Sequence, residues 1–172
     1  AFQKGYLKTQ APPGAIEFIK WNPNDFSEIR EAINNSDIVI NLIGILFETR
    51  KQKFSKIHID LPDLISKFCA ESKVKKFIHV SAIGANAESE SVYQQSKFQG
   101  EVKALNNFKN TVIIRPSVVC GTEDNFTNLF SKLSFLPVIP VVGINYKFQP
   151  ILVTDVADSI IKVIETKNNE GK

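Results

Sequence analysis

The segment KFIHVSAIGANAESESVYQQSK, residues 76–97, carries the clearest structural pattern in the chain. Its apolar start, KFIHVSA at Lys76–Ala82, predicts a β-strand. A loop rich in Gly, Asn, Ser and Glu follows, and the pattern from Ser91 to Phe108 predicts a helix. A strand joined to a helix in this order is typical of a right-handed βαβ unit.

The alternation of strand and helix extends to both sides of this segment. Upstream, we predict a strand at Ala15–Trp21, a helix at Phe26–Asn35, a strand at Asp37–Ile43 and a helix from Ile57 to Cys69 with Pro62 in its first turn or at a kink. Downstream, we predict a strand at 111–115, a helix at 125–135, a short strand at 149–153 and a helix at 155–166. Asp37–Ile43, DIVINLI, is almost entirely apolar, which is typical of a parallel strand covered on both faces. The sequence therefore predicts an α/β fold with a Rossmann-type, doubly wound parallel sheet.

Composition limits the classes of function. With 172 residues, 43% of them hydrophobic, and a net charge of +3, the chain suits one compact domain. Its basic residues are spread through the sequence, which argues against nucleic-acid binding. No apolar run approaches the roughly 18 to 20 residues that cross a bilayer, so any membrane association would be peripheral. Cys69 and Cys120 lie far apart without metal-type spacing, so no metal site is predicted.

Tyr93 and Lys97 are the strongest candidates for chemistry. At i and i+4 they lie on one face of the predicted helix, about 5 to 6 Å apart at Cβ. A neighbouring ammonium favours the phenolate, so we expect Lys97 to lower the pKa of Tyr93 into a useful range. Ser81 ends the preceding strand, and ligands of parallel sheets bind at the carboxyl ends of the strands. Its hydroxyl can hold the substrate oxygen whose proton the tyrosine gives or takes.

A simpler interpretation of the pair stays open, because Tyr-x-x-x-Lys often occurs by chance on a solvated helix face. Ser81 before the helix and the strand end Arg115-Pro116-Ser117 after it favour the functional interpretation. The combination is therefore more informative than the spacing alone.

Together these motifs resemble the short-chain dehydrogenase/reductase superfamily, in its extended or atypical branch, over about the whole chain. The resemblance rests on DIVINLIG, KFIHVSAIGA, Tyr93-x-x-x-Lys97, VIIRPSVVCGTED and QPILVTDVADSI. Within the superfamily, NLIGILFETR, FIHVSAIGANAES and RPSVVCGTEDNF are most similar to the nucleotide-binding accessory subunits of respiratory complex I (NADH:ubiquinone oxidoreductase) and their bacterial relatives. Those proteins resemble reductases but are held to bind NADPH structurally.

The resemblance implies roles for the residues that match the family motifs. Ser81, Tyr93 and Lys97 match the catalytic residues and would also contact the cofactor, which is expected to be NADP(H), with NAD as the alternative. The other implied cofactor contacts are Asp25 near the adenine, Asn41 and Gly44 beside the family's fourth strand, and Pro116, Ser117 and Val118 beside the nicotinamide.

Structural roles compete with several of these assignments. Asp25 also suits the N-cap of a helix, with Glu28 completing a capping box. Asn41 can satisfy a strand-end carbonyl, and Gly44 can permit a turn. His58 and His79 match no catalytic position, and we predict structural roles for both.

The family's opening strand, its Gly-x-x-Gly-x-x-Gly loop and its second strand have no counterpart here. Because those glycines let backbone amides reach the pyrophosphate, the phosphate half of the site is missing. In the 3-2-1-4-5-6 order, the missing strands would lie between Ala15–Trp21 and Asp37–Ile43. We therefore expect residues 1–172 to be a partial NAD(P)-binding Rossmann domain, from the third strand onward, with the substrate-side region starting near residue 121. A missing N-terminal segment or a companion chain would supply the glycine-rich loop.

Three function classes follow. The favoured one is an NADPH-binding structural subunit of a respiratory NADH dehydrogenase, with respiratory subunits as partners, on the matrix side of the mitochondrial inner membrane or in the bacterial cytoplasm. The second is an active NAD(P)-dependent reductase or nucleotide-sugar epimerase that uses Ser81, Tyr93 and Lys97. The third is a redox-sensing regulatory domain that binds NADP and protein partners. The fold alone does not decide among them, because one scaffold hosts many functions.

Overall fold

A three-stranded parallel sheet forms the centre of the structure. The computed structural model describes residues 7, 10–19, 25–122, 124 and 148–166. Strands β1 (Ile38–Asn41), β2 (Lys76–Val80) and β3 (Thr111–Ile114) follow the order β1-β2-β3, and both pairs are parallel. All three carboxyl ends therefore meet at one edge of the sheet. The predicted α/β, Rossmann-type class is confirmed.

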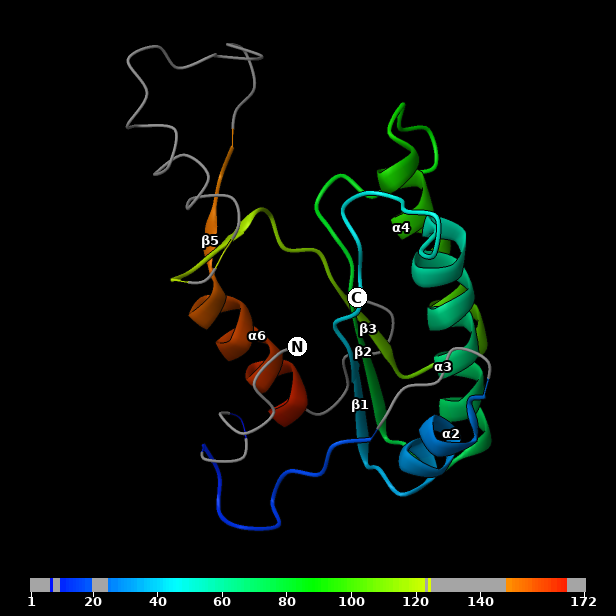
Figure 1. The fold of residues 1–172 in the computed structure, drawn as a ribbon, viewed down its shortest axis with the longest axis vertical. Helices are drawn as coiled ribbons and strands as arrows, with labels where there is room; N and C mark the ends of the chain where they lie inside the picture. The colour runs from blue at the N-terminus through cyan, green and yellow to red at the C-terminus, as the bar shows by residue number, and fades with distance from the viewer. Residues whose placement is uncertain (1–6, 8–9, 20–24, 123, 125–147, 167–172) are drawn as a thin grey trace.

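Four helical elements cover one face of this sheet (Figure 1). They are α2 (Ser27–Asn34), the π-helical turn η1 (Ser55–Asp60), α3 (Leu61–Glu71) and α4 (Val92–Asn107). The apolar core between these helices and the sheet comprises Ile33, Leu61, Ile65, Cys69, Val74, Phe77 and Ala104. The members from α3 are spaced by four residues, which puts them on one helix face. Pro62 stands in the first turn of α3, as predicted.

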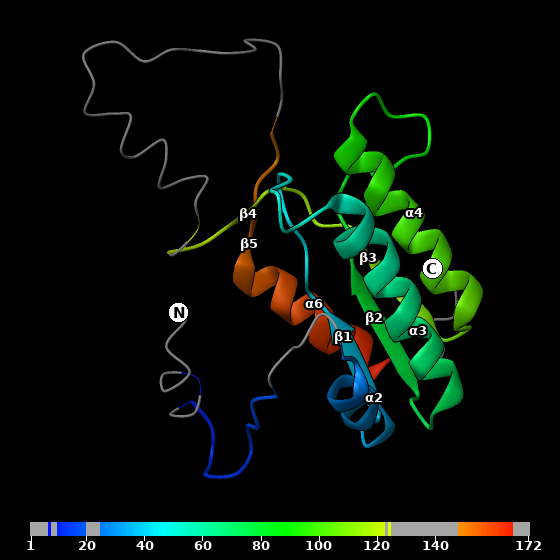
Figure 2. The ribbon, with the colours of Figure 1, turned by 45° about the vertical axis from the view of Figure 1, so that its right-hand side comes forward.

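A second, smaller unit of structure follows β3. Strands β4 (Val119–Cys120) and β5 (Ile151–Leu152) pair in parallel and lead into α6 (Val153–Glu165). Figures 1 and 2 place α6 on the opposite side of the central sheet from α3 and α4. The ammonium of Lys76, the first residue of β2, donates to the carbonyl oxygens of Val163 and Thr166, the latter at 2.7 Å. It thereby satisfies carbonyl groups at the C-terminal end of α6.

Some sequence predictions differ from the structure. Residues 15–19 of the predicted strand Ala15–Trp21 form no strand, because the described sheet offers no neighbour with which they pair. The predicted burial of Asp37–Ile43 on both faces is also wrong: β1 spans four residues at the edge of the described sheet, and Ile40 is 40% exposed. The sequence pattern missed β4 and the π-helical turn. The helix predicted at 125–135 lies outside the described residues.

Helix α4 and η1 approach each other very closely at Gly100. A Cβ atom at this position would overlap the carbonyl oxygen of His58 and would lie 3.1 Å from its carbonyl carbon. It would also lie 3.2 Å from Cγ of Pro62. Only glycine fits at this crossing, which sets how near α4 lies to His58.

No described helix is long and apolar enough to cross a lipid bilayer.

Candidate functional site

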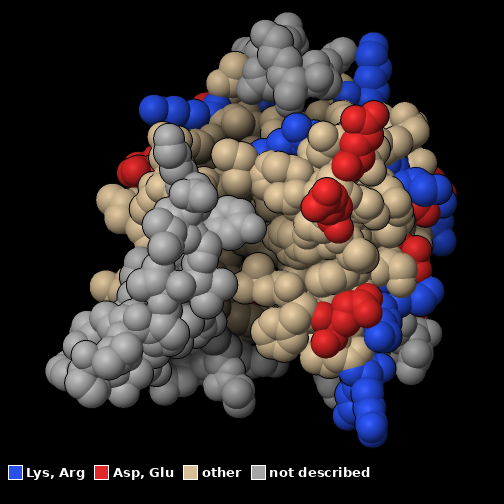
Figure 3. Space-filling view, turned by 90° about the horizontal axis from the view of Figure 1, so that it is seen from above, with Lys and Arg blue, Asp and Glu red and all other residues tan. Residues whose placement is uncertain are grey.

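The carboxyl edge of the sheet gathers most of the residues that the sequence singled out. Asn41 ends β1, Ser81 follows β2, and Pro116 follows β3. The first turns of α4 place Tyr93 and Lys97 over the same edge. Figure 3 looks down on this end of the molecule, and the middle of the visible surface carries few charged side chains, while Lys and Arg lie mainly at its rim.

Lys97 is buried beneath this surface and is bonded to the sheet. The residue is 3% exposed, and its Nζ donates to the carbonyl oxygen of Val80 at 3.0 Å. Burial lowers the pKa of Lys97 to about 8, although the nearby Glu101 carboxylate acts in the opposite direction. Glu101 is itself engaged by Arg115, whose Nε donates to Oε1 at 2.9 Å. Among the described residues, the Lys97 ammonium therefore bonds to a strand-end carbonyl and to no carboxylate.

Tyr93 behaves differently from the sequence prediction. Burial raises the pKa of its phenol, whereas we expected Lys97 to lower it. The cause is desolvation of the phenol by burial, and the Lys97 ammonium donates its hydrogen bond to the Val80 carbonyl rather than to the phenol. The structure therefore gives a neutral tyrosine that can donate a hydrogen bond.

Ser81 presents an unsatisfied hydroxyl at the end of β2. Its backbone N–H donates to the Ile114 carbonyl at 2.7 Å, which fixes the residue between the two strands. Its Oγ is buried and has no hydrogen-bond partner among the described residues. Buried polar groups are almost always satisfied, so an unpaired hydroxyl at a strand end fits a ligand that brings a polar atom to it.

Asn41 and Gly44 shape the loop that leaves β1. The Asn41 side chain donates from Nδ2 to Nδ1 of His79 at 3.1 Å and accepts the Ile43 N–H at 3.0 Å. The amide thus joins β1 to β2 through its nitrogen and organises the following loop through its oxygen. A Cβ on Gly44 would lie 3.7 Å from Nζ of Lys97, so the backbone of this glycine borders the buried ammonium.

The segment after β3 is tied to its neighbours through the backbone. The Pro116 carbonyl accepts the Ile83 N–H at 2.9 Å, and the Val118 carbonyl accepts the Ile151 N–H at 3.0 Å. Pro116, Ser117 and Val118 are all half-buried. The first bond holds the loops after β2 and β3 together near Ser81, and the second joins the segment after β3 to β5.

Asp25 lies one residue before the N-cap of α2, so it forms neither the predicted N-cap nor the predicted capping box. Its carboxylate accepts the Ser27 N–H at 3.0 Å, and this bond lowers the pKa of Asp25. Helix α2 has Phe26 at its N-cap without a side-chain cap hydrogen bond, so the capping box with Glu28 does not form. No described hydrogen bond connects Asp25 to the carboxyl edge of the sheet.

Three residues border the site without having been predicted from the sequence to belong to it, namely His58, Ser96 and Phe54. His58 Nδ1 lies 2.9 Å from Ser96 Oγ, and the rings of Phe54 and His58 stack at 5.0 Å. The His58 and Tyr93 rings meet edge to face at 5.4 Å. The sequence offered little signal for this contact, because it depends on the π-helical winding of η1.

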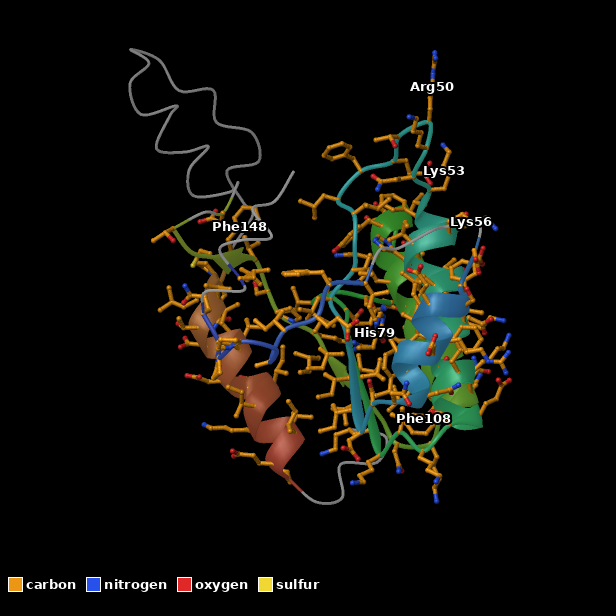
Figure 4. All side chains as sticks on the ribbon, turned by 60° about the horizontal axis from the view of Figure 1, so that its bottom comes forward. Arg50, Lys53, Lys56, His79, Phe108 and Phe148 are labelled. Atoms are coloured by element: carbon orange, nitrogen blue, oxygen red, sulfur yellow. The ribbon has the colours of Figure 1, made fainter. Side chains whose placement is uncertain are left out.

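Both histidines of the chain are buried and neutral. Burial, assisted by the charge of Lys97, lowers the pKa of His58 to about 4 and that of His79 to about 3. In Figure 4, His79 lies within the fold, whereas Arg50, Lys53 and Lys56, from the loop after β1 and the first turn of η1, lie at its outer end. The predicted structural role of His79 agrees with its bond to Asn41.

We expect the chain to lose stability in acid through these two side chains. An unfolded histidine has a pKa near 6.5, so the unfolded state binds protons that the folded state does not as the pH falls below about 6.5. The contribution of the two histidines to stability is therefore fully present above about pH 6.5. It is lost as the pH falls through the folded-state pKa values, about 4 for His58 and about 3 for His79. Histidine NMR tests this directly, because the chain has only two. A ring resonance of the folded protein that titrates with a midpoint near pH 6.5 would contradict it.

Known proteins of similar sequence include subunits of a respiratory enzyme. No family model matches the chain. It is 34% identical over 169 residues to the mitochondrial NADH dehydrogenase (ubiquinone) 1 alpha subcomplex subunit 9 of Mus musculus, covering 97% of the chain and 45% of that protein. The subunit of the same name from Dictyostelium discoideum is 34% identical, covering 96% and 46%. The mitochondrial NADH-ubiquinone oxidoreductase 40 kDa subunit of Neurospora crassa is 29% identical, covering 99% and 45%.

Solved structures share the fold at lower identity. UDP-glucuronic acid 4-epimerase from Bacillus cereus, in complex with UDP-glucuronic acid and NAD, superimposes with a TM-score of 0.77 at 21% identity, covering 97% of this chain and 62% of the other. dTDP-4-dehydrorhamnose reductase from Bacillus anthracis, in complex with NADP, gives 0.70 at 16% identity, covering 94% and 66%.

The fold and the strand-end site define a Rossmann-type domain, a fold that the epimerase and the reductase share. Over nearly its whole length, the chain is homologous to the alpha subcomplex subunit 9 proteins of NADH:ubiquinone oxidoreductase. It spans less than half the length of these curated relatives.

Proposed function

We propose that this chain is the nicotinamide-side part of a nucleotide-binding accessory subunit of respiratory NADH:ubiquinone oxidoreductase. The observation that carries the proposal is the 34% identity to the Mus musculus subunit over 97% of the chain. The ligand is NADP(H), with NAD as the alternative, and the partners are other respiratory subunits. The proposed location is the matrix side of the mitochondrial inner membrane, or the bacterial cytoplasm for a bacterial chain. The mitochondrial names of the relatives support the organelle.

Three residues support binding of the nicotinamide half. The unpaired Ser81 hydroxyl suits a polar atom of the nicotinamide or of a substrate, and the Lys97 ammonium suits the hydroxyls of a ribose. Tyr93 adds a phenol whose pKa burial raises, so at neutral pH it is a donor rather than a base. A bound nucleotide would stabilise the native state by mass action, which is what a structural ligand does.

The phosphate half of the nucleotide is proposed to bind outside these residues, on a segment or companion chain that carries a glycine-rich loop. The outer edge of β1 has no strand partner in the described sheet. An apolar cavity of about 300 Å³ opens beside that edge, between α2 and β1. It is lined chiefly by isoleucines, including Ile29, Ile33, Ile38 and Ile40. These features suit an apolar strand that extends the sheet beyond β1, which is how the partial domain from residue 1 to 172 would be completed.

Catalytic turnover as a reductase or nucleotide-sugar epimerase is the second candidate. Ser81, Tyr93 and Lys97 all meet at the carboxyl edge, and the fold is shared with an epimerase and a reductase. The low intrinsic acidity of Tyr93 disfavours this activity in the nucleotide-free chain.

Tyr93→Phe separates the two candidates. For a structural subunit, we expect the complete protein to bind NADPH with the affinity of the wild type within about tenfold, because one neutral hydrogen bond contributes only about 0.5 to 1.5 kcal/mol. Wild type and variant should both leave NADPH unoxidised when offered carbonyl compounds and nucleotide sugars. Binding is measured by calorimetry and oxidation by the loss of NADPH absorbance.

The control for this comparison is the wild-type protein carried through the same preparation. NADPH oxidation that the substitution abolishes would replace the structural proposal with the enzymatic one. Copurification of the wild type with other respiratory subunits would instead favour the accessory role.

A further inference from the structure

We propose that His58 is a positioning residue that fastens the Gly44–Ile45 loop to the Tyr93 helix and so sets the geometry of the nicotinamide half-site. The inference rests on the proposed nucleotide binding and adds a role for a histidine that the catalytic motifs do not include.

Hydrogen bonds define the orientation of the ring. The Ile45 N–H donates to Nε2 of His58 at 3.1 Å, so Nε2 is an acceptor. A neutral imidazole then carries its proton on Nδ1, which lies 2.9 Å from Oγ of Ser96. The Ser96 hydroxyl in turn donates to the Tyr93 carbonyl at 2.7 Å. Three successive hydrogen bonds therefore donate in the same direction, from the loop after β1 through His58 to the first turn of α4.

Ring packing also joins two of these segments, η1 with its N-cap Phe54 and the first turn of α4. Phe54 stacks on His58, with ring centroids 5.0 Å apart, and meets the edge of Tyr93 at 5.8 Å. The His58 and Tyr93 rings also pack edge to face at 5.4 Å. Such pairs restrict the side-chain rotations of all three residues, so the Tyr93 ring is held by the imidazole as well as by its backbone.

The loop that His58 fastens is otherwise open to solvent. Leu42, Leu46 and Phe47 are exposed, and Gly44 is exposed beside the buried Lys97. A Cβ on Gly44 would lie 3.8 Å from His58 Nε2 and 3.7 Å from Lys97 Nζ. The bond to Ile45 therefore holds the loop backbone directly over the ammonium. A nucleotide that contacts Gly44 and Lys97 at once depends on this placement.

The close crossing at Gly100 reinforces the arrangement. The His58 carbonyl packs against Gly100 of α4, while the His58 ring bonds to Ser96 one turn earlier. Backbone and side chain of one residue thus contact the same helix. This double attachment distinguishes His58 from a side chain that merely fills the core.

Three substitutions separate the ring from its hydrogen bonds. His58→Phe retains an aromatic ring for Phe54 but removes both bonds, and His58→Asn can reach Ser96 but not Ile45. His58→Gln places an amide oxygen near the position of Nε2 and retains the acceptor for the Ile45 N–H. A matched control is Thr111→Val, which removes a buried hydroxyl bonded to the carbonyls of Ala104 and Phe108 at the other end of α4.

The experiment measures the NADPH dissociation constant and the melting temperature of the complete protein for each variant, with the exchange rate of the Ile45 amide by NMR. We expect His58→Phe and His58→Asn to weaken NADPH binding by about tenfold or more, because displacement of binding groups by about 1 Å is costly. His58→Gln should stay within about threefold of the wild type. Thr111→Val should lower the melting temperature but leave binding unchanged. Fast exchange at Ile45 should accompany weak binding.

The outcomes distinguish the two proposals. A wild-type protein that binds neither NADPH nor NADH refutes the nucleotide-binding function and the inference that rests on it. Wild-type binding that His58→Phe and His58→Asn retain in full refutes the positioning role alone. Loss of binding that follows the melting temperature across all variants, Thr111→Val included, also refutes it, because the effect would then come from general destabilisation.

Discussion

Gly100→Ala should prevent the chain from folding. Alanine is usually the better helix former by about 0.8 to 1.0 kcal/mol, so propensity alone predicts the opposite. Here the added Cβ would overlap the His58 carbonyl oxygen and stand 3.1 Å from its carbon. That oxygen belongs to the backbone of η1 and does not rotate away as a side chain does. We expect a loss of about 4 kcal/mol or more, which is a large part of the stability of a typical domain.

Circular dichroism and the yield of soluble protein measure this effect. Gln99→Ala is a suitable control, because Gln99 is exposed and adjacent on the same helix. It should leave the unfolding free energy within about 0.5 kcal/mol of the wild type. A Gly100→Ala variant with wild-type stability would mean that α4 and η1 lie further apart than described.

Lys97→Met should weaken nucleotide binding strongly while leaving the folded chain as stable as the wild type or more so. The ammonium is 3% exposed and bonds to Val80, so at neutral pH the fold carries a buried charge. Methionine is apolar, unbranched and flexible, and replacement of buried charges by apolar groups is often neutral or stabilising. Loss of a charged hydrogen-bond donor to the ribose should weaken NADPH binding by about tenfold to a hundredfold, corresponding to about 1.5 to 3 kcal/mol.

The pH dependence of stability provides an internal check on this result. Burial holds the pKa of Lys97 at about 8 in the folded state, below the value near 10.4 of an unfolded lysine. Between these values the unfolded state binds the extra proton, so wild-type stability rises with pH. Lys97→Met lacks this rise, so any advantage of the variant in melting temperature should shrink from pH 7.5 to about pH 10. A constant difference across this range would show that Lys97 is not buried as a charge.

The sequence was most informative about the sheet and about which side chains share its carboxyl edge. β2 and α4 follow directly from an apolar run and a long helical pattern, and Ser81, Tyr93 and Lys97 could be brought together because parallel strands end at one edge. Local pattern failed where a segment depends on its neighbours. Residues 15–19 alternate like a strand yet have no ladder partner, and β4 is only two residues long.

The chemistry of the site was harder to predict than its composition. The pKa of Tyr93 depends on where the Lys97 ammonium points, and a spacing of four residues does not specify that direction. The role of His58 depends on the wide winding of η1 and on the absence of a side chain at Gly100, 42 positions later in the chain. Such contacts come from tertiary structure and leave little trace in local sequence.

Strand β2 is bonded at both ends to helices that lie on opposite faces of the sheet. At its first residue, Lys76 holds the C-terminal end of α6, and at its last residue, the Val80 carbonyl holds Lys97 of α4. Five residues of strand span only about 16 Å. The strand therefore connects the outer helix directly to the lysine that we propose binds the ribose. A protein partner that docks on α6 and shifts it would strain the proposed nucleotide site through β2, without touching the nucleotide.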